Sequence, residues 1–407
     1  MNLLHLLPEM LSLLAAVGLA VLALPALVFA AQVLASSLLG LPPDRMSRPV
    51  APHGRRPSVG VIVPAHNEES GLAQTLAALR PQLESADRLL VVADNCTDRT
   101  ADVAIAAGAE VAVRADALRR GKGYALDHGL QLMKAAPPEV ILIVDADCRV
   151  MPGAVERLVR RAHAEQVPIQ STYLMHAPAG ARLGLRIAAF AMVVKNQVRP
   201  AGAAWMGLPC QLMGTGMAFP WPLLQQVSLA TGHIVEDMQL GTELALAGSA
   251  PRFEPRSLVD SEFPVSQAGA ATQRTRWEHG HLQVMLTQAP RLLLRGLVRG
   301  DIRAAALAAD LLVPPLALLV MALVGTSLLA AGAALLGGWA APPAFGLLLL
   351  ALVSSGVLAA WWRFGRTCVG FGELLRAPAY VLGKVPVYAR FVVARQSEWV
   401  RTRRRGE

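Results

Sequence analysis

Two long stretches without charge constrain this chain more than any other feature of its sequence. Residues 11–43 contain no charged side chain, and residues 304–362 contain only Asp310. A helix crosses a bilayer with about 20 apolar residues. The first stretch is long enough for one span, and the second, interrupted by paired glycines and prolines near residue 340, is long enough for two. We therefore expect three spans, the first of them an uncleaved anchor, since it is too long for a signal peptide and lacks a basic leading region.

Lys and Arg beside the spans predict the orientation, because cytoplasmic flanks hold most of the positive charge. No Lys or Arg precedes the first span. Basic residues follow the first and the last span: Arg45, Arg48, Arg55 and Arg56, and then Arg363, Arg366, Arg376, Lys384, Arg390, Arg395, Arg401, Arg403, Arg404 and Arg405. The pattern predicts a multi-pass protein of the cytoplasmic (inner) membrane, with the N-terminus outside and the middle of the chain and the C-terminus in the cytoplasm.

The net charge of +9 has the same explanation. Much of the excess flanks the spans, where it would attract anionic lipid, so we expect membrane lipid and no nucleic acid as a partner. The four cysteines are scattered without the paired spacing of a zinc site or a disulfide framework, which fits a reducing compartment.

The composition divides the chain into five parts. These are an N-terminal transmembrane anchor (1–44), a cytoplasmic domain (45–285), an interfacial amphipathic helix (286–303), two transmembrane helices (304–364) and a basic interfacial and cytoplasmic tail (365–407). Basic amphipathic patterns at 289–303 and 374–395 predict helices in the headgroup region, with re-entrant or partly buried helices as the alternative.

In the cytoplasmic domain, short apolar runs alternate with helical patterns, which is typical of an α/β fold on a mainly parallel sheet. We expect strands at 59–63, 89–92 and 140–144, and helices near 69–83, 98–107, 124–134 and 153–164.

Polar residues follow these strands, at the edge where a parallel sheet binds its ligands. Pro64, His66 and Glu68 follow the first strand, and Asp94 and Asp98 belong to the segment after the second. Taken singly, such residues are most often turn and helix-cap residues. Two such strand ends in succession favour a nucleotide pocket.

The third strand ends in Asp145-x-Asp147. Side chains two apart in an extended segment point the same way, so both carboxylates can face one divalent cation and the phosphates it bridges. A helix cap before Pro152 is the alternative. Two carboxylates buried together without a cation or hydrogen bonds would be costly, and we therefore favour a metal site.

Three further segments carry candidate chemistry. Lys122 lies in a basic glycine turn that lacks the residue spacing of a Walker phosphate loop. Its side chain either approaches a diphosphate or is exposed to solvent. Glu236 and Asp237 open a helix, where carboxylates complement the dipole, but one of them can also act as a general base. Arg276 beside Trp277 offers a fork for phosphate oxygens and an aromatic face for a sugar, or is an interfacial pair.

In their order, these elements resemble membrane-bound glycosyltransferase family 2, whose catalytic domain has the GT-A fold, a Rossmann-like, mainly parallel sheet. The resemblance extends over residues 59–277 and rests on Asp145-x-Asp147, Glu236-Asp237 and Gln273-x-x-Arg276-Trp277. The segments at 94–98, 121–126 and 213–217 look like the branch that makes bacterial exopolysaccharides such as methanolan.

The resemblance implies roles for residues of this chain. On the donor side, a uridine site would be lined by Pro64, His66, Glu68 and Asp94, the diphosphate would be approached by Lys122 and Asp145, and Mg²⁺ or Mn²⁺ would be bound by Asp147. The base would be Asp237, beside Glu236. The acceptor would be bordered by Gly214, Thr215 and Gly216, while the diphosphate and the acceptor sugar would be held by Gln273, Arg276 and Trp277. The family's Thr-Glu-Asp reads Val235-Glu236-Asp237 here, which removes a hydroxyl beside the base.

The implied function is inverting transfer of one sugar from a UDP-sugar to a lipid-linked or glycan acceptor in exopolysaccharide biosynthesis, in a homo-oligomer or with polysaccharide-assembly partners. A processive β-glycan synthase of the poly-N-acetylglucosamine or hyaluronan type is the close alternative, because Gln-x-x-Arg-Trp is typical of polymerising relatives. Three spans are few for a polymer channel. A non-catalytic nucleotide-binding subunit would tolerate loss of Asp145, Asp147, Asp237 or Arg276, and all four are present.

Overall fold

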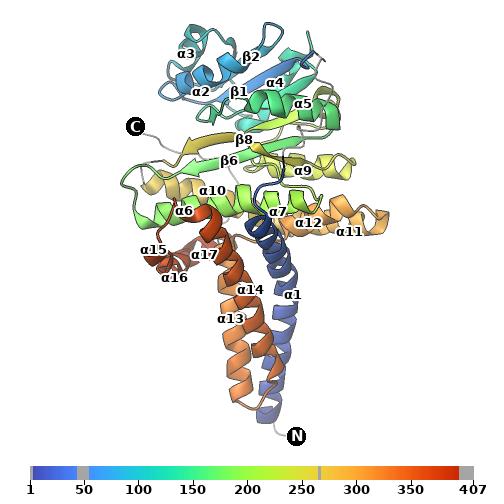
Figure 1. Ribbon diagram of the computed structural model, residues 1–407, viewed down its shortest axis with the longest axis vertical. Coiled ribbons are helices and arrows are strands. Elements are labelled where there is room, and N and C mark those ends of the chain that lie inside the picture. Colours follow the sequence, from blue (N-terminus) through green and yellow to red (C-terminus); the bar gives the residue numbers. More distant parts are fainter. Residues whose placement is uncertain (1–2, 44–54, 265–266, 394–407) are drawn as a thin grey trace.

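The computed structural model describes residues 3–43, 55–264 and 267–393. Three tiers follow one another along its longest axis: a β-sheet with its flanking helices, a layer of helices beneath the sheet, and a stalk of three long helices (Figure 1). Of the basic residues that predict the orientation, Arg45, Arg48, Arg395 and the four arginines after residue 400 lie outside the described residues.

The sheet has eight strands in the order β3-β2-β1-β4-β7-β6-β8-β5. The strands are β1 (Val59–Ala65), β2 (Arg88–Asp94), β3 (Glu110–Arg114), β4 (Val140–Ile143), β5 (Arg149–Val150), β6 (Ile169–His176), β7 (Met217–Pro220) and β8 (Arg252–Glu262). From β3 to β4 all neighbours are parallel, whereas β7 runs antiparallel to both β4 and β6. The expected α/β fold is confirmed, and beyond β4 the sheet is mixed.

Helices cover both faces of the sheet, because its central strands are apolar on both sides. Val61 and Val63 of β1 pack into one buried cluster, while Ile62 between them packs into another on the opposite face. The helices and turns of this tier are α2 (Leu72–Leu79), η2 (Arg80–Gln82), α3 (Thr100–Ala106), α4 (Lys122–Met133), α5 (Ala154–Glu165), α8 (Trp221–Leu224) and α9 (Glu236–Leu246). The three expected strands and four expected helices are all present, with ends shifted by up to three residues.

The layer beneath the sheet combines segments from distant parts of the chain. It contains α6 (Leu183–Val193), the π-helical turn η3 (Val194–Val198), α7 (Arg199–Trp205), α10 (Gln267–Thr287), α11 (Ala289–Arg299), α12 (Ile302–Leu311), α15 (Phe371–Leu374), α16 (Ala377–Leu382) and α17 (Val385–Val393). The expected helix at 289–303 is split, because Gly300 adopts a left-handed conformation with φ of 65° and Asp301 caps α12. The expected helix at 374–395 is likewise divided among α15, α16 and α17.

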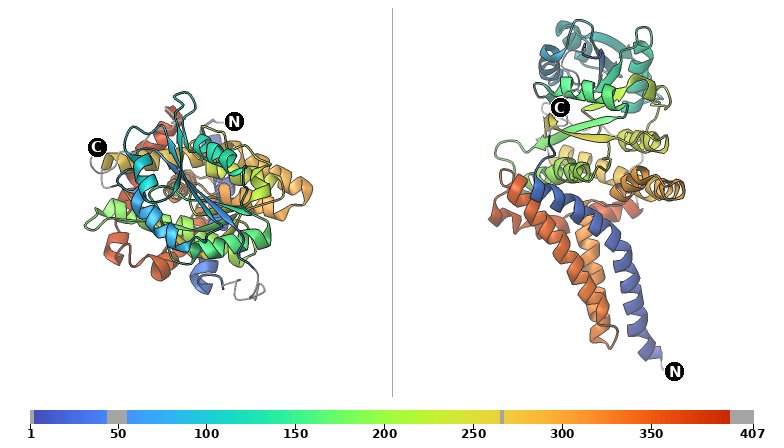
Figure 2. Two further views of the ribbon diagram at one scale, coloured as in Figure 1. Left: turned by 90° about the horizontal axis from the view of Figure 1, so that it is seen from above. Right: turned by 45° about the vertical axis from the view of Figure 1, so that its right-hand side comes forward.

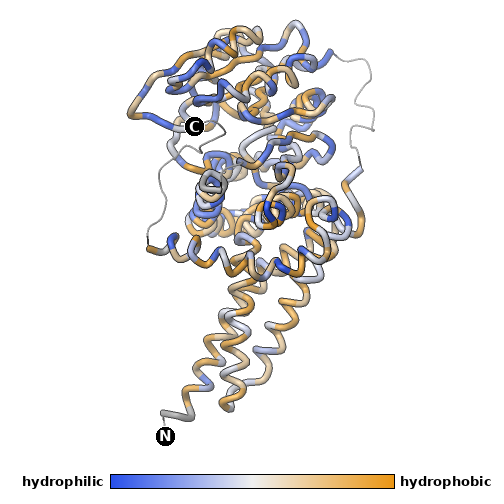
Figure 3. Tube along the Cα trace, turned by 90° about the vertical axis from the view of Figure 1, so that its left-hand side faces the viewer, coloured by the Kyte–Doolittle hydropathy of each residue, from blue (hydrophilic) through white to orange (hydrophobic). Residues whose placement is uncertain are grey.

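The stalk consists of α1 (Leu3–Leu39), α13 (Leu316–Leu335) and α14 (Ala341–Ala360), the last continued by the π-helical turn η4 (Trp361–Gly365). These three helices are long and apolar enough to cross a membrane (Figures 2 and 3). They pack on one another through a shared cluster that includes Leu19, Phe29, Leu323 and Leu349. The second span begins at Leu316 rather than near residue 304, because α12 ends at Leu311 and the prolines before Leu316 start a new helix.

A buried polar network joins the stalk to the layer above it. Asp310 of α12 accepts hydrogen bonds from Gln32 of α1 at 2.8 Å, from Arg199 of α7 at 2.6 Å and from Gln211 at 2.7 Å. Arg199 also donates to the Gln32 side chain at 2.9 Å. Next to this network, a Cβ at Gly202 would collide with the carbonyl of Gln32, so α1 and α7 approach closely. The charges of Arg199 and Asp310 are thus compensated inside the protein.

Candidate functional site

A cavity of about 690 Å³ lies between the sheet and the layer beneath it. We call its upper side the strand wall, formed by the loops after β1, β2 and β4 and the start of α4, with His66, Asp94, Lys122, Asp145 and Asp147. We call its lower side the helix wall, formed by α6, η3 and α10, with Met192, Lys195, Asn196, Gln273, Arg276 and Trp277. The start of α9, with Glu236 and Asp237, completes the lining.

The loops after β1 and β2 hold each other through hydrogen bonds. The carbonyl of Asp94 lies 2.7 Å from His66 Nδ1, and its carboxylate accepts a bond from Arg114 at 2.5 Å. Asn67 and Asn95 adopt left-handed conformations, with φ of 55° and 50°, and their side-chain oxygens each accept a backbone N–H from a neighbouring loop. The asparagines therefore shape the turns, while His66, Glu68 and Asp94 line the cavity.

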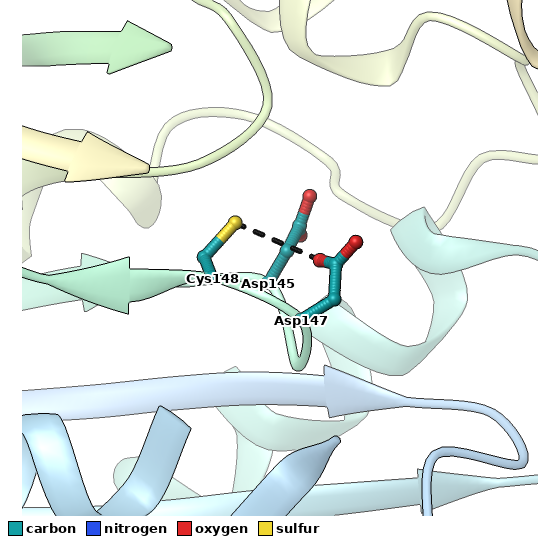
Figure 4. Close-up of side chains that lie close together, drawn as sticks. All are labelled: Asp145, Asp147 and Cys148. Atoms are coloured by element: carbon teal, nitrogen blue, oxygen red, sulfur yellow. Dashed lines mark hydrogen bonds between the residues drawn. The ribbon is translucent and has the colours of Figure 1, made fainter. Parts of the chain in front are cut away.

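Asp145 and Asp147 converge in a turn directly after β4 (Figure 4). Ligand atoms of Asp145, Asp147 and Cys148 all lie within 4.8 Å of one another. The convergence was expected from an extended segment, but the chain turns here, with the Cys148 amide donating to the Asp145 carbonyl at 3.1 Å. The Asp145 amide donates to the hydroxyl of buried Thr215 at 3.0 Å, which fixes the turn from below.

Lys122, the first residue of α4, is a cation of the strand wall. Its ammonium lies 2.5 Å from Asp145 and 3.6 Å from Glu236, and it donates to the carbonyl of Gly214 at 2.6 Å. Burial by itself would lower the pKa of Lys122, but the carboxylates of Asp145 and Glu236 outweigh it and raise that pKa above its usual value. Lys122 is therefore charged and already bonded to protein oxygens.

Glu236 and Asp237 begin α9, as the sequence predicts, and both line the cavity. Burial and then the negative charge of Glu236 raise the pKa of Asp237 to about 7, although Lys122 and Lys195 oppose the rise. A carboxylate with that pKa can accept a proton near neutral pH. Gly214 lies beside it, because a Cβ there would stand 3.5 Å from Asp237 Oδ2.

The helix wall brings α10 opposite these carboxylates. Gln273, Arg276 and Trp277 share one face of α10 and line the cavity. Burial lowers the pKa of Arg276, and the negative charges of Glu236 and Asp145 oppose this shift. The guanidinium is thus held close to the acidic end of the cavity.

The structure brings nearly all the candidate residues together. Pro64, His66, Glu68, Asp94, Lys122, Asp145, Asp147, Gly214, Glu236, Asp237, Gln273, Arg276 and Trp277 line the same cavity.

Thr215 and Gly216 lie beneath the cavity rather than on its surface. Thr215 is fully buried, and its carbonyl accepts a bond from Gln170 at 3.0 Å. Gly216 has φ of 63°, and a Cβ there would collide with the hydroxyl of Ser171. Thr215 supports the Asp145 turn, and of Gly214, Thr215 and Gly216 only Gly214 lies on the cavity wall.

Sequence reasoning missed Tyr173 of β6 and the helix-wall residues Met192, Lys195 and Asn196. One signal was available in the sequence. An apolar run extends from Ile187 to Val194, and Lys195 and Asn196 follow it before the next apolar residue, Val198. A lysine-asparagine pair inside a buried helical segment indicates a polar surface within the fold, since buried polar groups need partners.

The residues around Asp145 and Asp147 fit a divalent cation. The cavity lining contains six carboxylates and four cationic side chains, so negative charge is in excess. Burial raises the pKa of Asp145, and Lys122 only partly offsets this while Asp147 adds to it. Burial also raises the pKa of the Cys148 thiol, so Cys148 remains neutral and donates to Asp147 at 3.6 Å. Two carboxylates without a thiolate suit Mg²⁺ or Mn²⁺, which prefer oxygen ligands.

Comparison with known sequences identifies a family. The model of "Glycosyltransferase like family 2" matches residues 57–280, more than half of the chain. The probable glycosyltransferase YdaM of Bacillus subtilis is 26% identical over 244 residues, which are 56% of each protein. An uncharacterized protein of Methanocaldococcus jannaschii is 36% identical over 100 residues, 25% of this chain and 40% of that protein. The matches thus cover about half the length of these relatives.

Among solved structures, the mannosyltransferase PcManGT from Pyrobaculum calidifontis, in complex with GDP-Man and Mn²⁺, superposes with a TM-score of 0.51. The match covers 93% of this chain and 100% of PcManGT at 20% sequence identity. At this identity the likeness shows a shared fold, which extends beyond the sheet into the helices that follow it.

Proposed function

The chain belongs to glycosyltransferase family 2, and we propose that it is an inverting, metal-dependent glycosyltransferase that moves a sugar from a UDP-sugar to a lipid-linked or glycan acceptor. One observation carries the proposal: a single cavity contains Asp145 and Asp147 on one side and, facing them, Asp237 and Arg276. Sugar transfer needs residues that bind the diphosphate and a base for the acceptor hydroxyl in the same cavity.

The reaction is a single displacement. The acceptor hydroxyl oxygen forms a bond to the anomeric carbon of the donor sugar, the bond from that carbon to the diphosphate oxygen breaks, and its electron pair leaves with UDP. Asp237 takes the proton of the attacking hydroxyl. One base and one displacement invert the anomeric centre, and no second carboxylate is needed as a nucleophile.

Charge stabilisation is divided between the walls. Asp147 and Asp145 would hold Mg²⁺ or Mn²⁺, which neutralises charge on the leaving diphosphate. Lys122 and Arg276 add positive charge from the strand wall and the helix wall, and Glu236 keeps the pKa of the adjacent base near neutrality. Pro64, His66, Glu68 and Asp94 would hold the uridine, while Gly214, Gln273 and Trp277 would position the acceptor.

The stalk would anchor this site to a membrane. Three apolar helices are long enough to span it, and the helix wall belongs to the layer that joins them. An acceptor carried by lipid would reach the cavity from this side. We further propose that the catalytic domain lies in the cytoplasm and that the product enters exopolysaccharide assembly, with partner proteins or further copies of the chain.

A processive β-glycan synthase is the second candidate, favoured by Gln273, Arg276 and Trp277 on the helix wall. The packing of the stalk argues for single transfer, since α1, α13 and α14 share one apolar cluster. Product length by mass spectrometry separates the two: a ladder of long glycans would indicate polymerisation.

A donor screen tests the proposal. Membranes that contain the full chain are supplied with UDP-glucose, UDP-galactose, UDP-N-acetylglucosamine or GDP-mannose, with Mn²⁺ or with EDTA, and release of the nucleoside diphosphate is measured. We expect metal-dependent turnover with one of the UDP-sugars. Turnover with GDP-mannose alone would refute the UDP assignment, and no turnover with any donor would favour a non-catalytic nucleotide-binding subunit.

A further inference from the structure

The helix wall contains a lysine that the proposed chemistry does not use. Lys195 lies in the π-helical turn η3 and lines the cavity. Among the described residues its ammonium has no hydrogen bond and no carboxylate within 4.0 Å. Burial lowers the pKa of Lys195, while the negative charge of Asp237 opposes that shift. A cation so placed is costly unless something in the cavity compensates it.

Two other cations nearby, Lys122 and Arg199, already have carboxylate partners. Lys122 bonds to Asp145 and the carbonyl of Gly214, and Arg199, four residues after Lys195, pairs with Asp310 at 2.6 Å. Lys195 is therefore not required to neutralise either of these carboxylates. It remains available to a negatively charged group that enters the cavity.

Neighbouring amides on the helix wall also lack partners. The side-chain oxygens of Asn196, from η3, and Gln273, from α10, are buried without a hydrogen-bond donor among the described residues. An unsatisfied buried polar atom has lost its hydrogen bonds to water without replacement, so native proteins keep few of them. A hydroxyl-bearing ligand between the two helices could donate to these oxygens after a change of side-chain torsion. π-helical turns such as η3 are frequent at functional sites.

The position of η3 defines which ligand would meet Lys195. Val194 precedes Lys195 in the sequence and Val198 follows it. Both valines pack into the apolar cluster that η3 shares with the three stalk helices. Lys195 thus lies on the membrane side of the cavity, across from the Asp145 and Asp147 turn. Asp237 lines the same cavity as Lys122 of the strand wall and Lys195 of the helix wall.

We propose that Lys195 binds a phosphate group of the acceptor, with Asn196 contributing to the attached sugar, so that the acceptor hydroxyl is presented to Asp237. This rests on the proposed function and assigns its acceptor class: phosphate-bearing rather than neutral. The phosphate belongs either to a lipid carrier or to a soluble sugar phosphate.

Binding is tested on the full chain in detergent, with UDP and Mn²⁺ present so that the donor side is filled. The probes are farnesyl phosphate against farnesol, and glucose 6-phosphate against glucose, and the readout is the shift in thermal unfolding. We expect one phosphate probe, and neither neutral one, to stabilise the native protein. Lys195→Met should weaken the affinity for that phosphate probe by about 10- to 100-fold, because one charge-assisted hydrogen bond is lost. Lys195→Arg should restore most of the affinity.

Lys134→Met is the matched control, since Lys134 is an exposed lysine at the end of α4, outside the cavity. Stabilisation by farnesyl phosphate assigns a lipid acceptor, and stabilisation by glucose 6-phosphate a soluble one. Equal effects of phosphate and neutral probes, or equal binding by native protein and Lys195→Met, would overturn the proposal.

Activity gives a second, separable readout. With an active acceptor, Lys195→Met should raise the acceptor KM and leave the donor KM unchanged. An unchanged acceptor KM with a shifted pH midpoint of kcat would mean that Lys195 only tunes Asp237, which also overturns the proposal. If the native protein releases no UDP from any donor, the proposed function fails, and the binding comparison still decides the role of Lys195.

Discussion

The two walls of the cavity differ in how their polar groups are satisfied. On the strand wall, Asp94 is bonded to Arg114, Asn67 to Thr97 and Lys122 to Asp145. On the helix wall, the Lys195 ammonium and the side-chain oxygens of Asn196 and Gln273 have no hydrogen-bond partner among the residues described. The strand wall is therefore preorganised, whereas these three groups of the helix wall are left to a ligand.

This difference indicates which wall determines specificity for the acceptor. A preorganised wall binds a common group, such as a nucleoside diphosphate, without changing its own bonds. A wall with unsatisfied groups discriminates between acceptors, because an acceptor that cannot satisfy those groups leaves them buried and unpaired. Substitutions on the two walls should then have separable kinetic effects.

The largest expected effect is at Asp237, between the walls. Asp237→Asn removes the proton acceptor and should lower kcat by about 10²- to 10⁴-fold, while UDP affinity stays nearly unchanged, because the base acts in the transition state. Single-turnover transfer and UDP titration measure the two quantities. Glu243→Gln on the same helix, which alters a carboxylate that accepts a bond from Gln239 and does not line this cavity, is the control. Substantial turnover by Asp237→Asn would show that the base is another group.

Asp147 tests the strand wall by itself. Asp147→Ala should weaken Mn²⁺-dependent UDP binding by more than about tenfold, or about 1.4 kcal/mol, and leave acceptor affinity unchanged. Isothermal titration with UDP, in Mn²⁺ and in EDTA, checks this. Equal UDP affinity with and without metal in the native protein would contradict the metal site.

The pH dependence tests the electrostatic link across the cavity. Asp237 accepts a proton only when ionised, and its pKa is about 7. Below pH 7, kcat/KM should therefore rise about tenfold per pH unit and then level off above it. Glu236→Gln removes the negative charge that helps to raise this pKa, so the midpoint should move to lower pH, with Lys122 and Lys195 still facing the base. An unchanged midpoint in Glu236→Gln would exclude Asp237 as the titrating group.

The smallest expected effect concerns support from beneath the strand wall. Thr215→Val keeps the shape of the side chain but leaves the Asp145 amide without its acceptor, which costs about 1–3 kcal/mol. We expect a lower Tm and a donor KM raised severalfold, with the acceptor KM unchanged. A selective rise in the acceptor KM would instead restore Thr215 to the acceptor side.

The sequence predicted those parts of the fold whose signal is local. The strands β1, β2 and β4 are continuous apolar runs, buried on both faces, and stand out from their surroundings. By contrast, β8 contains charged residues and Pro255, and the ladder between β6 and β8 is irregular at Ser171 and Thr172. Such strands form because of their neighbours in the sheet, which a local pattern does not reveal.

The same division applies to the site. Residues that follow strongly apolar strands were predicted, because the topology of a parallel sheet places them at one edge. Lys195 and Asn196 were not, since they meet the cavity only after α6 and η3 pack against the stalk. The burial of Thr215 was not predicted either, because its hydroxyl bonds to a backbone amide 70 residues away.

The buried contact of Gln32 with Arg199 and Asp310 has a practical consequence for anyone who would shorten the chain. Cutting after residue 44 follows the boundary suggested by composition, yet it would remove Gln32 from this buried hydrogen-bond network and uncover the surface of α7 that packs on α1. The globular part and α1 therefore share buried polar contacts. Purification of the intact polypeptide in detergent or nanodiscs keeps these contacts in place.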